Sequence, residues 1–396
     1  MSFQVSKVIV SGAVLALIAA CSGEQNQQTS TDADSSSVAA VEGPSLVQQT
    51  IPTTDELGTF DTPVSGLAVW EHPDVIFESL VLAANGAAGI IAVNFEQEAV
   101  ASLPGTFETG LALCYLPDGQ TSAGIIAAYD ESAGMLRFVD LEAGPVSFVE
   151  WDITGETEQL ATLRPLCFGK SANDDRLSLF AIDAAGYLSR SFVSLNREAL
   201  QITPATSLGR SDVTTCASND VTGETYFLGA NGSVEVANAF AETVSFEPFM
   251  DLPGGEAVEL ATALRAENVS YLLAMVSSEI ASGPYVIYAY ALSEAQAVGQ
   301  FTLGEFSEIT AVETISAFTA DASNFGGLYR EGAIAIVEGN DTFTLKLASW
   351  SAVSNILDLP QTDRLDRRDI GFRPASDDGE ELLLQLPELV SEPTVQ

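Results

Sequence analysis

The chain has 396 residues, and its 55 acidic side chains outnumber 15 basic ones, so that its formal net charge at pH 7 is −40. A surface of this charge repels polyanions unless a cation intervenes, which excludes nucleic acid as a partner. The single histidine excludes a zinc site made of several histidines. Solubility in a salty medium, where ions screen charges beyond about 10 Å, is the simplest reason for most of the charge.

The N-terminal residues 1–20 have the features of a targeting segment. The apolar run Val8–Ala20 is shorter than the roughly 20 residues that span a bilayer. It ends in Leu17-Ile-Ala-Ala-Cys21, which resembles the lipobox of bacterial lipoproteins, whose cysteine thiol receives a lipid. An ordinary secretory signal that contains a cysteine is the alternative. We expect a lipoprotein signal peptide, lipidation of Cys21 and stable attachment through the acyl chains.

The residues after Cys21 point to the place of the protein in the cell. Ser22 rather than Asp follows the cysteine, which in the lipoprotein sorting pattern favours the outer membrane. Residues 21–48 are rich in Ser, Gln, Thr and Asp and predict a flexible polar tether. The predicted location is the cell envelope, on the periplasmic or surface face of the outer membrane, with an acidic C-terminal tail at 376–396.

A short apolar segment recurs six times between the tether and the tail. The copies start roughly 45 to 55 residues apart, a period that is typical of propeller blades. They are Pro63–Asp74, Gly110–Gly119, Arg164–Ser171, Asp212–Asp220, Val258–Arg265 and Val312–Thr319.

Each copy leads into an apolar run, a turn and a second apolar run, which is the pattern of a β-hairpin. Turns such as Asn85-Gly86 and Asn231-Gly232 supply the positive φ angles that tight hairpins need. A copy, a hairpin and a returning strand make a four-stranded blade, so residues 49–375 predict an all-β fold, a six-bladed β-propeller. An all-β protein with irregular strands is the alternative fold. A short helix is predicted for residues 351–357. The expected hairpin strands are 79–84 with 90–95, 124–129 with 135–140, 177–182 with 187–193, 225–228 with 233–237, 271–276 with 285–290, and 333–337 with 342–347.

Three cysteines remain after lipidation, at matching places in the second, third and fourth repeats. If a disulfide forms, we expect Cys167 with Cys216, which leaves Cys114 as a free thiol. A bond requires Cα atoms within about 7 Å, and the divergence of neighbouring inner strands works against it. Three buried thiols that act as small apolar side chains are the alternative.

Taken together, the repeats resemble the β-propeller phytase family over about Pro63 to Leu359. The motifs that carry the resemblance include Ala68-Val-Trp-Glu-His-Pro73, Ser211–Asp220 with Gly223–Tyr226, Tyr271–Ser278 with Tyr285–Tyr288, and Gly332–Gly339 with Thr344–Trp350. The resemblance implies a six-bladed propeller and a 3-phytase activity. In that family, carboxylates hold several Ca²⁺ ions, which bind phosphate oxygens and activate a water molecule for attack.

This chain departs from the family at most of the positions that would hold metal or phosphate. The replacements are Ser65-Gly66, Ala112, Cys114, Ala184-Ala185, Thr214 and Gly229-Ala230. His72 and Asp220 persist, either as site residues or as turn and packing residues. Glu259, Glu313 and Glu338 also persist at acidic positions of the family and are the candidate Ca²⁺ ligands, with solvated rim residues as the alternative.

These observations favour a lipid-anchored, phytase-like propeller that is degenerate and non-catalytic and acts as a binding or accessory module in the cell envelope. Its expected partners are the outer membrane, through the lipid, and either an envelope protein or a phosphorylated ligand. The alternative enzyme is a Ca²⁺-dependent phosphatase with a rebuilt site. A lectin-like or protein-binding propeller is a third possibility.

Overall fold

The computed structural model describes residues 47–115, 124–155, 157–171, 174–196, 199–252, 256–266, 269–277, 285–293, 295–339 and 342–360. The chain divides into Met1–Ser45 and Leu46–Gln396, and all of the described residues belong to the second unit. The predicted signal peptide, nearly all of the tether and the C-terminal tail therefore lie outside the described residues. None of the helices in the described part is both long and apolar enough to cross a membrane.

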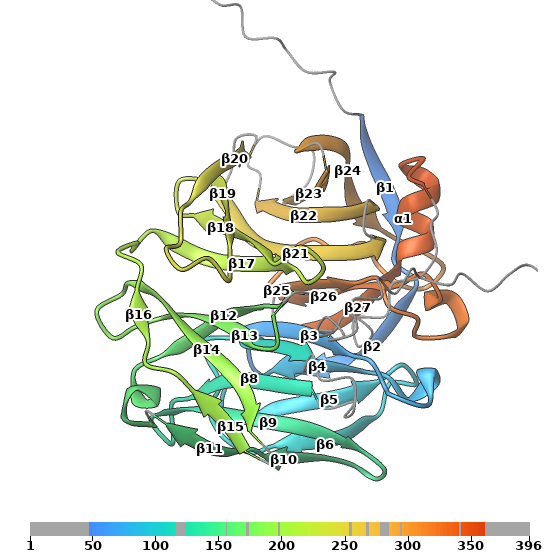
Figure 1. Cartoon of the computed structure of the whole chain (residues 1–396). Coiled ribbons are helices and arrows are strands. Elements are labelled where there is room, and N and C mark those ends of the chain that lie inside the picture. Colours follow the sequence, from blue (N-terminus) through green and yellow to red (C-terminus); the bar gives the residue numbers. More distant parts are fainter. Residues whose placement is uncertain are drawn as a thin grey trace, which may run out of the picture. The chain divides into compact units, whose positions relative to one another are not determined.

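The described unit consists of six β-sheets, and in each one the sequence neighbours pair antiparallel (Figure 1). Blade 1 contains β3 (Gly66–Trp70), β4 (Leu80–Ala84), β5 (Ile90–Asn94) and β6 (Ala99–Leu103). Blade 2 contains β7 (Leu111–Tyr115), β8 (Gly124–Asp130), β9 (Met135–Ala143) and β10 (Val146–Glu150). Blade 3 contains β12 (Arg164–Gly169), β13 (Leu177–Ile182), β14 (Leu188–Asn196) and β15 (Ala199–Ile202), to which β11 (Asp152–Gly155) and β16 (Thr206–Ser207) are added.

The last three blades follow the same plan, and two of them take a strand from the start of the described chain. Blade 4 contains β17 (Val213–Asn219), β18 (Glu224–Gly229), β19 (Ser233–Asn238) and β20 (Glu247–Asp251). Blade 5 contains β21 (Glu256–Ala266), β22 (Val269–Ser277), β23 (Tyr285–Ala291), β24 (Gln296–Gly304) and β1 (Gln48–Pro52). Blade 6 contains β25 (Ala317–Asp321), β26 (Ala333–Gly339), β27 (Phe343–Ser349) and β2 (Asp55–Phe60).

The first strand of each blade contacts the first strand of the next one. The contacts run β3 to β7, β12, β17, β21 and β25, and β25 returns to β3. A cycle of six inner strands with a sheet extending from each is a six-bladed β-propeller, so the predicted fold is confirmed. The arrangement leaves only short strand edges exposed to pairing with other chains.

Two strands at the start of the described chain close the propeller. β2 pairs antiparallel with β27 and completes blade 6, whose other strands come from the other end of the chain. β1 pairs in parallel with β24 as a fifth strand of blade 5. The Thr54 hydroxyl, between β1 and β2, lies 2.7 Å from the Tyr329 hydroxyl of blade 6. Neither strand was predicted, because the repeats give no indication of where the first residues of the propeller pair.

The hairpins form where the sequence predicted them. Gly86 and Gly232 occupy positive φ angles of 50° and 82° in the turns after β4 and β18, which residues other than glycine rarely adopt. The sixth inner strand begins later than the repeat indicated, at Ala317 rather than near Val312. The expected helix near residues 351–357 is α1 (Trp350–Ile356), and three short 3₁₀ helices, η1 (Ile76–Glu78), η2 (Thr157–Ala161) and η3 (Gly327–Tyr329), lie in connections.

The core lies between adjacent blades rather than in one central layer. In β4, for example, all five residues are buried, because neighbouring sheets cover both faces of the strand. Phe301, Phe318 and Trp350 belong to one cluster that joins blades 5 and 6. At about 25 cal/mol per Å² of buried apolar surface, these interfaces supply the main stabilising free energy and hold the six inner strands around one axis.

Candidate functional site

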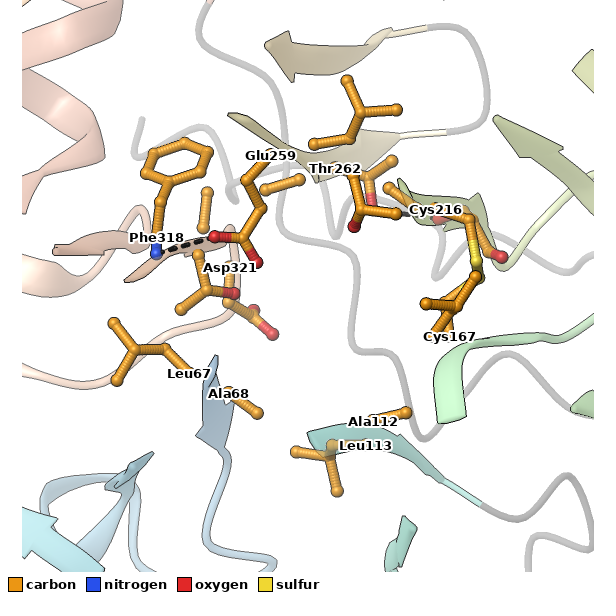
Figure 2. Close-up of a pocket in the computed structure, with 18 of the residues that line it drawn as sticks. Leu67, Ala68, Ala112, Leu113, Cys167, Cys216, Glu259, Thr262, Phe318 and Asp321 are labelled. Carbon is orange, nitrogen blue, oxygen red and sulfur yellow. Dashed lines mark hydrogen bonds between the residues drawn. A yellow bond between two sulfur atoms is a disulfide. The ribbon is translucent and has the colours of Figure 1, made fainter. Parts of the chain in front are cut away.

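The strongest candidate site is a pocket that the six inner strands share, which we call the axial pocket. Its volume is about 120 Å³, and each blade contributes three or four consecutive residues to its wall (Figure 2). Propellers commonly carry their ligand sites where the blades meet, because the loops and inner strands of every blade converge there. The lining segments are Leu67–Val69, Leu111–Leu113, Leu166–Phe168, Thr215–Ser218, Glu259–Thr262 and Phe318–Asp321.

The residues that line the axial pocket are mostly small or apolar in type, but the surface that they expose to the pocket is mainly polar. Alanines occur in five of the six lining segments, and they allow the inner strands to approach one another closely. Glu259 and Asp321 are the carboxyl groups among the described lining residues, and these residues include no Lys, Arg or His. The pocket therefore combines a mainly polar surface with two acidic side chains, and its described wall offers no cationic side chain to an anion.

Glu259 on β21 is one of the residues that line the axial pocket. The Phe318 N–H of the neighbouring blade donates a hydrogen bond of 3.0 Å to Glu259 Oε2, and Figure 2 shows this bond. Burial raises the pKa of the Glu259 carboxyl to about 8, because desolvation disfavours the charged form more strongly than the Phe318 N–H favours it. The folded state therefore favours the protonated form of this carboxyl group.

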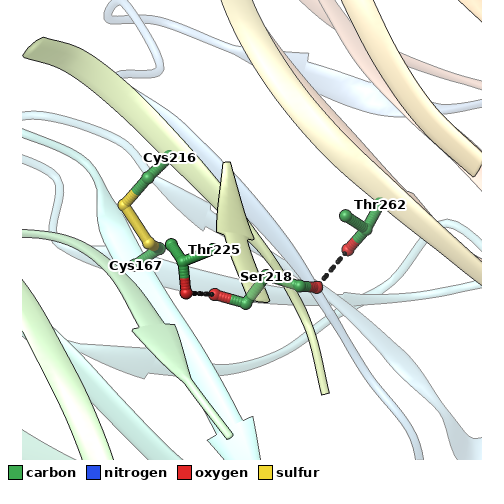
Figure 3. The surroundings of a disulfide bond; sticks show 5 residues. All are labelled: Cys167, Cys216, Ser218, Thr225 and Thr262. Atoms are coloured by element: carbon green, nitrogen blue, oxygen red, sulfur yellow. Dashed lines mark hydrogen bonds between the residues drawn. A yellow bond between two sulfur atoms is a disulfide. The ribbon is translucent and has the colours of Figure 1, made fainter. Parts of the chain in front are cut away.

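Further polar residues on β21, β17 and β25 line the pocket. Thr262 Oγ1 donates to the Ser218 carbonyl oxygen over 2.9 Å, which links blades 5 and 4, and the Ser218 hydroxyl lies 2.9 Å from Thr225 Oγ1 (Figure 3). Asp321 is buried at the end of β25, where its Oδ1 accepts a hydrogen bond of 2.7 Å from the Ser323 N–H. These bonds fix the polar side chains in place before any ligand is bound.

The pocket also contains the two cysteines that were expected to pair. Cys167 on β12 and Cys216 on β17 form a disulfide, with their Cα atoms 5.7 Å apart (Figure 3). The inner strands of blades 3 and 4 are thus close enough for the bond despite their divergence away from the axis. Cys114, the third cysteine, is a buried free thiol on β7.

The other two predicted metal ligands, Glu313 and Glu338, lie in a separate pocket of about 290 Å³. The Glu313 N–H donates to Glu338 Oε1 over 2.8 Å, and Lys346 Nζ donates to Glu338 Oε2 over 2.6 Å. Lys346 is buried and also donates to the carbonyl and hydroxyl oxygens of Thr310. Glu338 is therefore held by an ion pair and a backbone N–H.

The structure does not bring the three candidate Ca²⁺ ligands together. Glu259 lines the axial pocket, whereas Glu313 and Glu338 line the other one. Ca²⁺ takes six to eight oxygen ligands, and the described residues contain no group of three or more His, Cys, Asp or Glu side chains that fits a metal ion. The described residues therefore do not show one site made of all three, and Ca²⁺ binding by these glutamates stays a prediction.

Two other family positions have structural roles in this chain. His72 Nδ1 accepts the N–H groups of Asp74 and Val75, at 3.1 and 2.8 Å, and so stabilises a turn. Gly66 packs against the backbone of Gly110 in blade 2, and a Cβ placed at Gly66 would lie 2.8 Å from the Gly110 Cα. The described structure therefore leaves no space for a carboxylate at position 66.

Sequence reasoning found Glu259 but missed Asp321, Ser218 and Thr262. Asp321 was missed because it lies beyond the predicted sixth copy, Val312–Thr319, whereas β25 begins later and extends to Asp321. Asp321, Ser218 and Thr262 all lie on inner strands. An alignment of the six repeats is the sequence signal that could have identified them. Cys21, the predicted lipidation site, lies outside the described residues.

Comparison with known proteins identifies no family for this chain. No protein-family model matches the chain, and no curated protein matches it. Among solved structures, the β-propeller domain of Cps50 (Swd1) from Myceliophteria thermophila is 11% identical with a TM-score of 0.40, and the match covers 72% of this chain and 83% of that one. BBS1N, solved in complex with ARL6DN, is 12% identical with a TM-score of 0.41, and the match covers 76% and 80% of the two chains. The resemblance to phytases therefore rests on the sequence motifs alone.

Proposed function

We propose that this protein is a non-catalytic binding module of the bacterial cell envelope, a degenerate relative of the β-propeller phytases that is anchored to the outer membrane through lipid on Cys21. The observation that carries the proposal is the axial pocket. It is a preformed concavity to which all six blades contribute, with carboxyl and hydroxyl side chains among its lining residues. The lipobox-like sequence and the polar tether support the anchoring.

Catalysis of phosphate-ester hydrolysis is not favoured by this arrangement. A phosphate needs metal ions or Lys and Arg groups to balance its charge, and the described wall of the axial pocket contains no basic residue. Gly66 is packed against Gly110 where the family has an aspartate. The alternative of a rebuilt Ca²⁺-dependent phosphatase would need carboxylates that converge, and Glu259 is separated from Glu313 and Glu338.

The first test is phosphate release from calcium phytate by the full-length protein, with and without a chelator. An intact β-propeller phytase serves as the positive control. We expect no release above background, because losing one electrostatic partner of the transition state commonly lowers a rate about 10² to 10³-fold. Chelator-sensitive turnover within about tenfold of the control, lost in Glu259→Gln, would contradict the proposal.

The second test concerns the anchor. Radiolabelled palmitate supplied to a bacterial host that makes the protein should label the wild type, and it should not label Cys21→Ser. Cys114→Ser is the matched control, since it removes a different thiol and should label like the wild type. Equal labelling of the wild type and Cys21→Ser would contradict lipid attachment at this cysteine.

A further inference from the structure

Two large apolar side chains are exposed on neighbouring connections of the propeller. Phe77, on η1 of blade 1, is 66% exposed, and Leu328, on η3 of blade 6, is 65% exposed. A Cβ added at Gly326 would overlap the Phe77 ring, so the two connections lie against each other. With Val75, which is 40% exposed, these side chains form a surface that we call the Phe77–Leu328 patch. Apolar side chains that are exposed together commonly mark a place where another segment or molecule binds.

The backbone that carries the patch is held by hydrogen bonds. The Leu328 carbonyl oxygen accepts a hydrogen bond of 2.8 Å from the Ser349 hydroxyl. In the other connection, the Glu78 N–H donates to the Val75 carbonyl oxygen over 2.8 Å. The patch is therefore a preformed surface, and a segment that docks on it does not have to order the propeller first.

The charges around the patch limit what can cover it. Asp74 and Glu78 are exposed beside the apolar side chains, and Arg330 is the exposed basic residue of the connections 71–79 and 322–332. A second copy of the chain brings the same net charge of −40 to this surface and is repelled. The patch therefore fits a segment that combines apolar side chains with basic ones.

A segment of this kind follows the propeller in the same chain. Residues 364–373 read Arg-Leu-Asp-Arg-Arg-Asp-Ile-Gly-Phe-Arg and contain 4 of the 15 basic residues of the chain. With their two aspartates they have a formal charge of +2, opposite in sign to that of the whole protein. Leu365, Ile370 and Phe372 are the apolar side chains. The segment lies outside the described residues, which end at Pro360.

The described chain ends near the patch. Ser349, which is hydrogen bonded to Leu328, immediately precedes α1. Within this helix the Ser354 carbonyl oxygen accepts a hydrogen bond of 2.8 Å from the Leu359 N–H. At a rise of about 1.5 Å per helical residue, Leu359 therefore lies roughly 10 to 15 Å from Leu328. Ten extended residues span at most about 33 to 36 Å, so the segment can reach the patch.

We propose that residues 364–373 dock on the Phe77–Leu328 patch of the same chain. Their apolar side chains cover Phe77 and Leu328, and their arginines face Asp74 and Glu78. Because the segment is covalently linked, its effective concentration at the patch is on the order of millimolar, and a weak contact suffices. The contact ties the end of the chain to blades 6 and 1. This inference goes beyond the proposed function, because the patch residues do not line the axial pocket.

The test is limited trypsin digestion of the full-length protein, with the fragments identified by mass spectrometry. Trypsin cleaves after arginine, so cleavage after Arg364 and Arg367 reports on the segment itself. A docked segment is cleaved when it detaches, and the rate then follows the detached fraction. We expect the variant Phe77→Ser/Leu328→Ser to be cleaved at these two bonds about tenfold faster than the wild type or more.

Two controls separate loss of docking from loss of stability. Tyr187→Ser replaces a side chain that is 42% exposed in blade 3, and it should be cleaved at the wild-type rate. Cleavage after Arg210, in the described propeller, measures general unfolding and should be equally slow in all variants.

A substitution in the segment tests the other side of the contact. Phe372→Ser should also accelerate cleavage after Arg364 and Arg367, although it changes no residue of the described propeller. The triple variant Phe77→Ser/Leu328→Ser/Phe372→Ser should be cleaved no faster than the faster of the other two, because the same contact is lost once. If the patch variant fails to fold, Phe372→Ser decides the question.

Three results would overturn the inference. The first is equal cleavage after Arg364 and Arg367 in the wild type and in Phe372→Ser. The second is full additivity of the patch and segment substitutions in the triple variant. The third is protection of the wild type that disappears on dilution, which would assign the patch to a second copy of the chain. Each of them leaves the proposed function standing, since that proposal is tested by phytate turnover and by lipid labelling.

Discussion

Replacing both cysteines of the disulfide, in the variant Cys167→Ala/Cys216→Ala, should destabilise the propeller substantially. The bond closes a loop with a sequence separation of 49 residues between the inner strands of blades 3 and 4. Loop closure of this length removes entropy from the unfolded chain that is worth about 4 kcal/mol at 25 °C. Measured effects commonly fall below this value, so we expect the free energy of unfolding to decrease by about 2 to 4 kcal/mol.

The measurement is urea unfolding of the oxidised wild type and the double variant, with the free energy taken from linear extrapolation. Cys114→Ala is the control, because Cys114 is buried and lies outside the disulfide, so its replacement removes a small side chain and leaves the bond intact. The control should lose about 1 kcal/mol or less from the loss of packing. Wild-type protein treated with a reductant should unfold like the double variant.

Equal midpoints for the double variant, the reduced wild type and the oxidised wild type would refute this reasoning. A loss in Cys114→Ala as large as that in the double variant would also contradict it, because packing of the sulfur atoms rather than closure of the loop would then explain the effect. A change in the slope of the urea dependence would show that the unfolded state has become less compact, which the loop-closure argument expects.

Three further predictions concern single residues. Leu57→Ala should lower the free energy of unfolding by about 2 to 5 kcal/mol in urea, since this buried leucine of β2 packs where blade 6 closes. The control Glu56→Ala replaces an exposed side chain of the same strand and should have little effect. Gly66→Ala should lower the melting temperature, because its Cβ would meet Gly110 at 2.8 Å, and an unchanged value would contradict the close packing of blades 1 and 2. The pKa of Glu259 is about 8 in the folded state and 4.5 in the unfolded state. The free energy of unfolding of the wild type, relative to that of Glu259→Gln, should therefore decrease as the pH rises from about 4.5 to about 8. Parallel pH dependences of the two proteins would contradict the raised pKa.

The blades were predictable from the sequence because their information is local. An inner segment, a glycine turn and two apolar runs recur in order, and tight turns such as the one at Gly232 require the positive φ that glycine adopts readily. Such a hairpin needs no distant residue to specify its register. The repeat therefore indicated both the number of blades and the position of most strands.

The closure of the propeller was not predictable in the same way. β2 pairs with β27 across almost the whole length of the described chain, and its sequence, Asp55–Phe60, has no turn that would connect it to that partner. The partner of an edge strand depends on which sheet has a free edge after the ring has formed. That is a property of the assembled fold, and a pattern read along the chain does not contain it.

The candidate site was predictable only in part. Glu259 stood out because its position matches an acidic position of a known family, but grouping it with Glu313 and Glu338 assumed that acidic positions of neighbouring blades meet at one point. Glu338 instead pairs with the buried Lys346. Whether a side chain on an inner strand faces the axis or an adjoining pocket depends on strand register, and bulges such as the one near Glu259 shift that register.

The position of β1 and β2 determines how the protein responds to mechanical load. Both are edge strands, β1 on blade 5 and β2 on blade 6, and they precede every other strand of the described chain. Tension applied at the N-terminal side therefore acts first on the ladder between β1 and β24 and next on the ladder between β2 and β27. The inner strands that surround the axial pocket come under load only after both edge strands have detached.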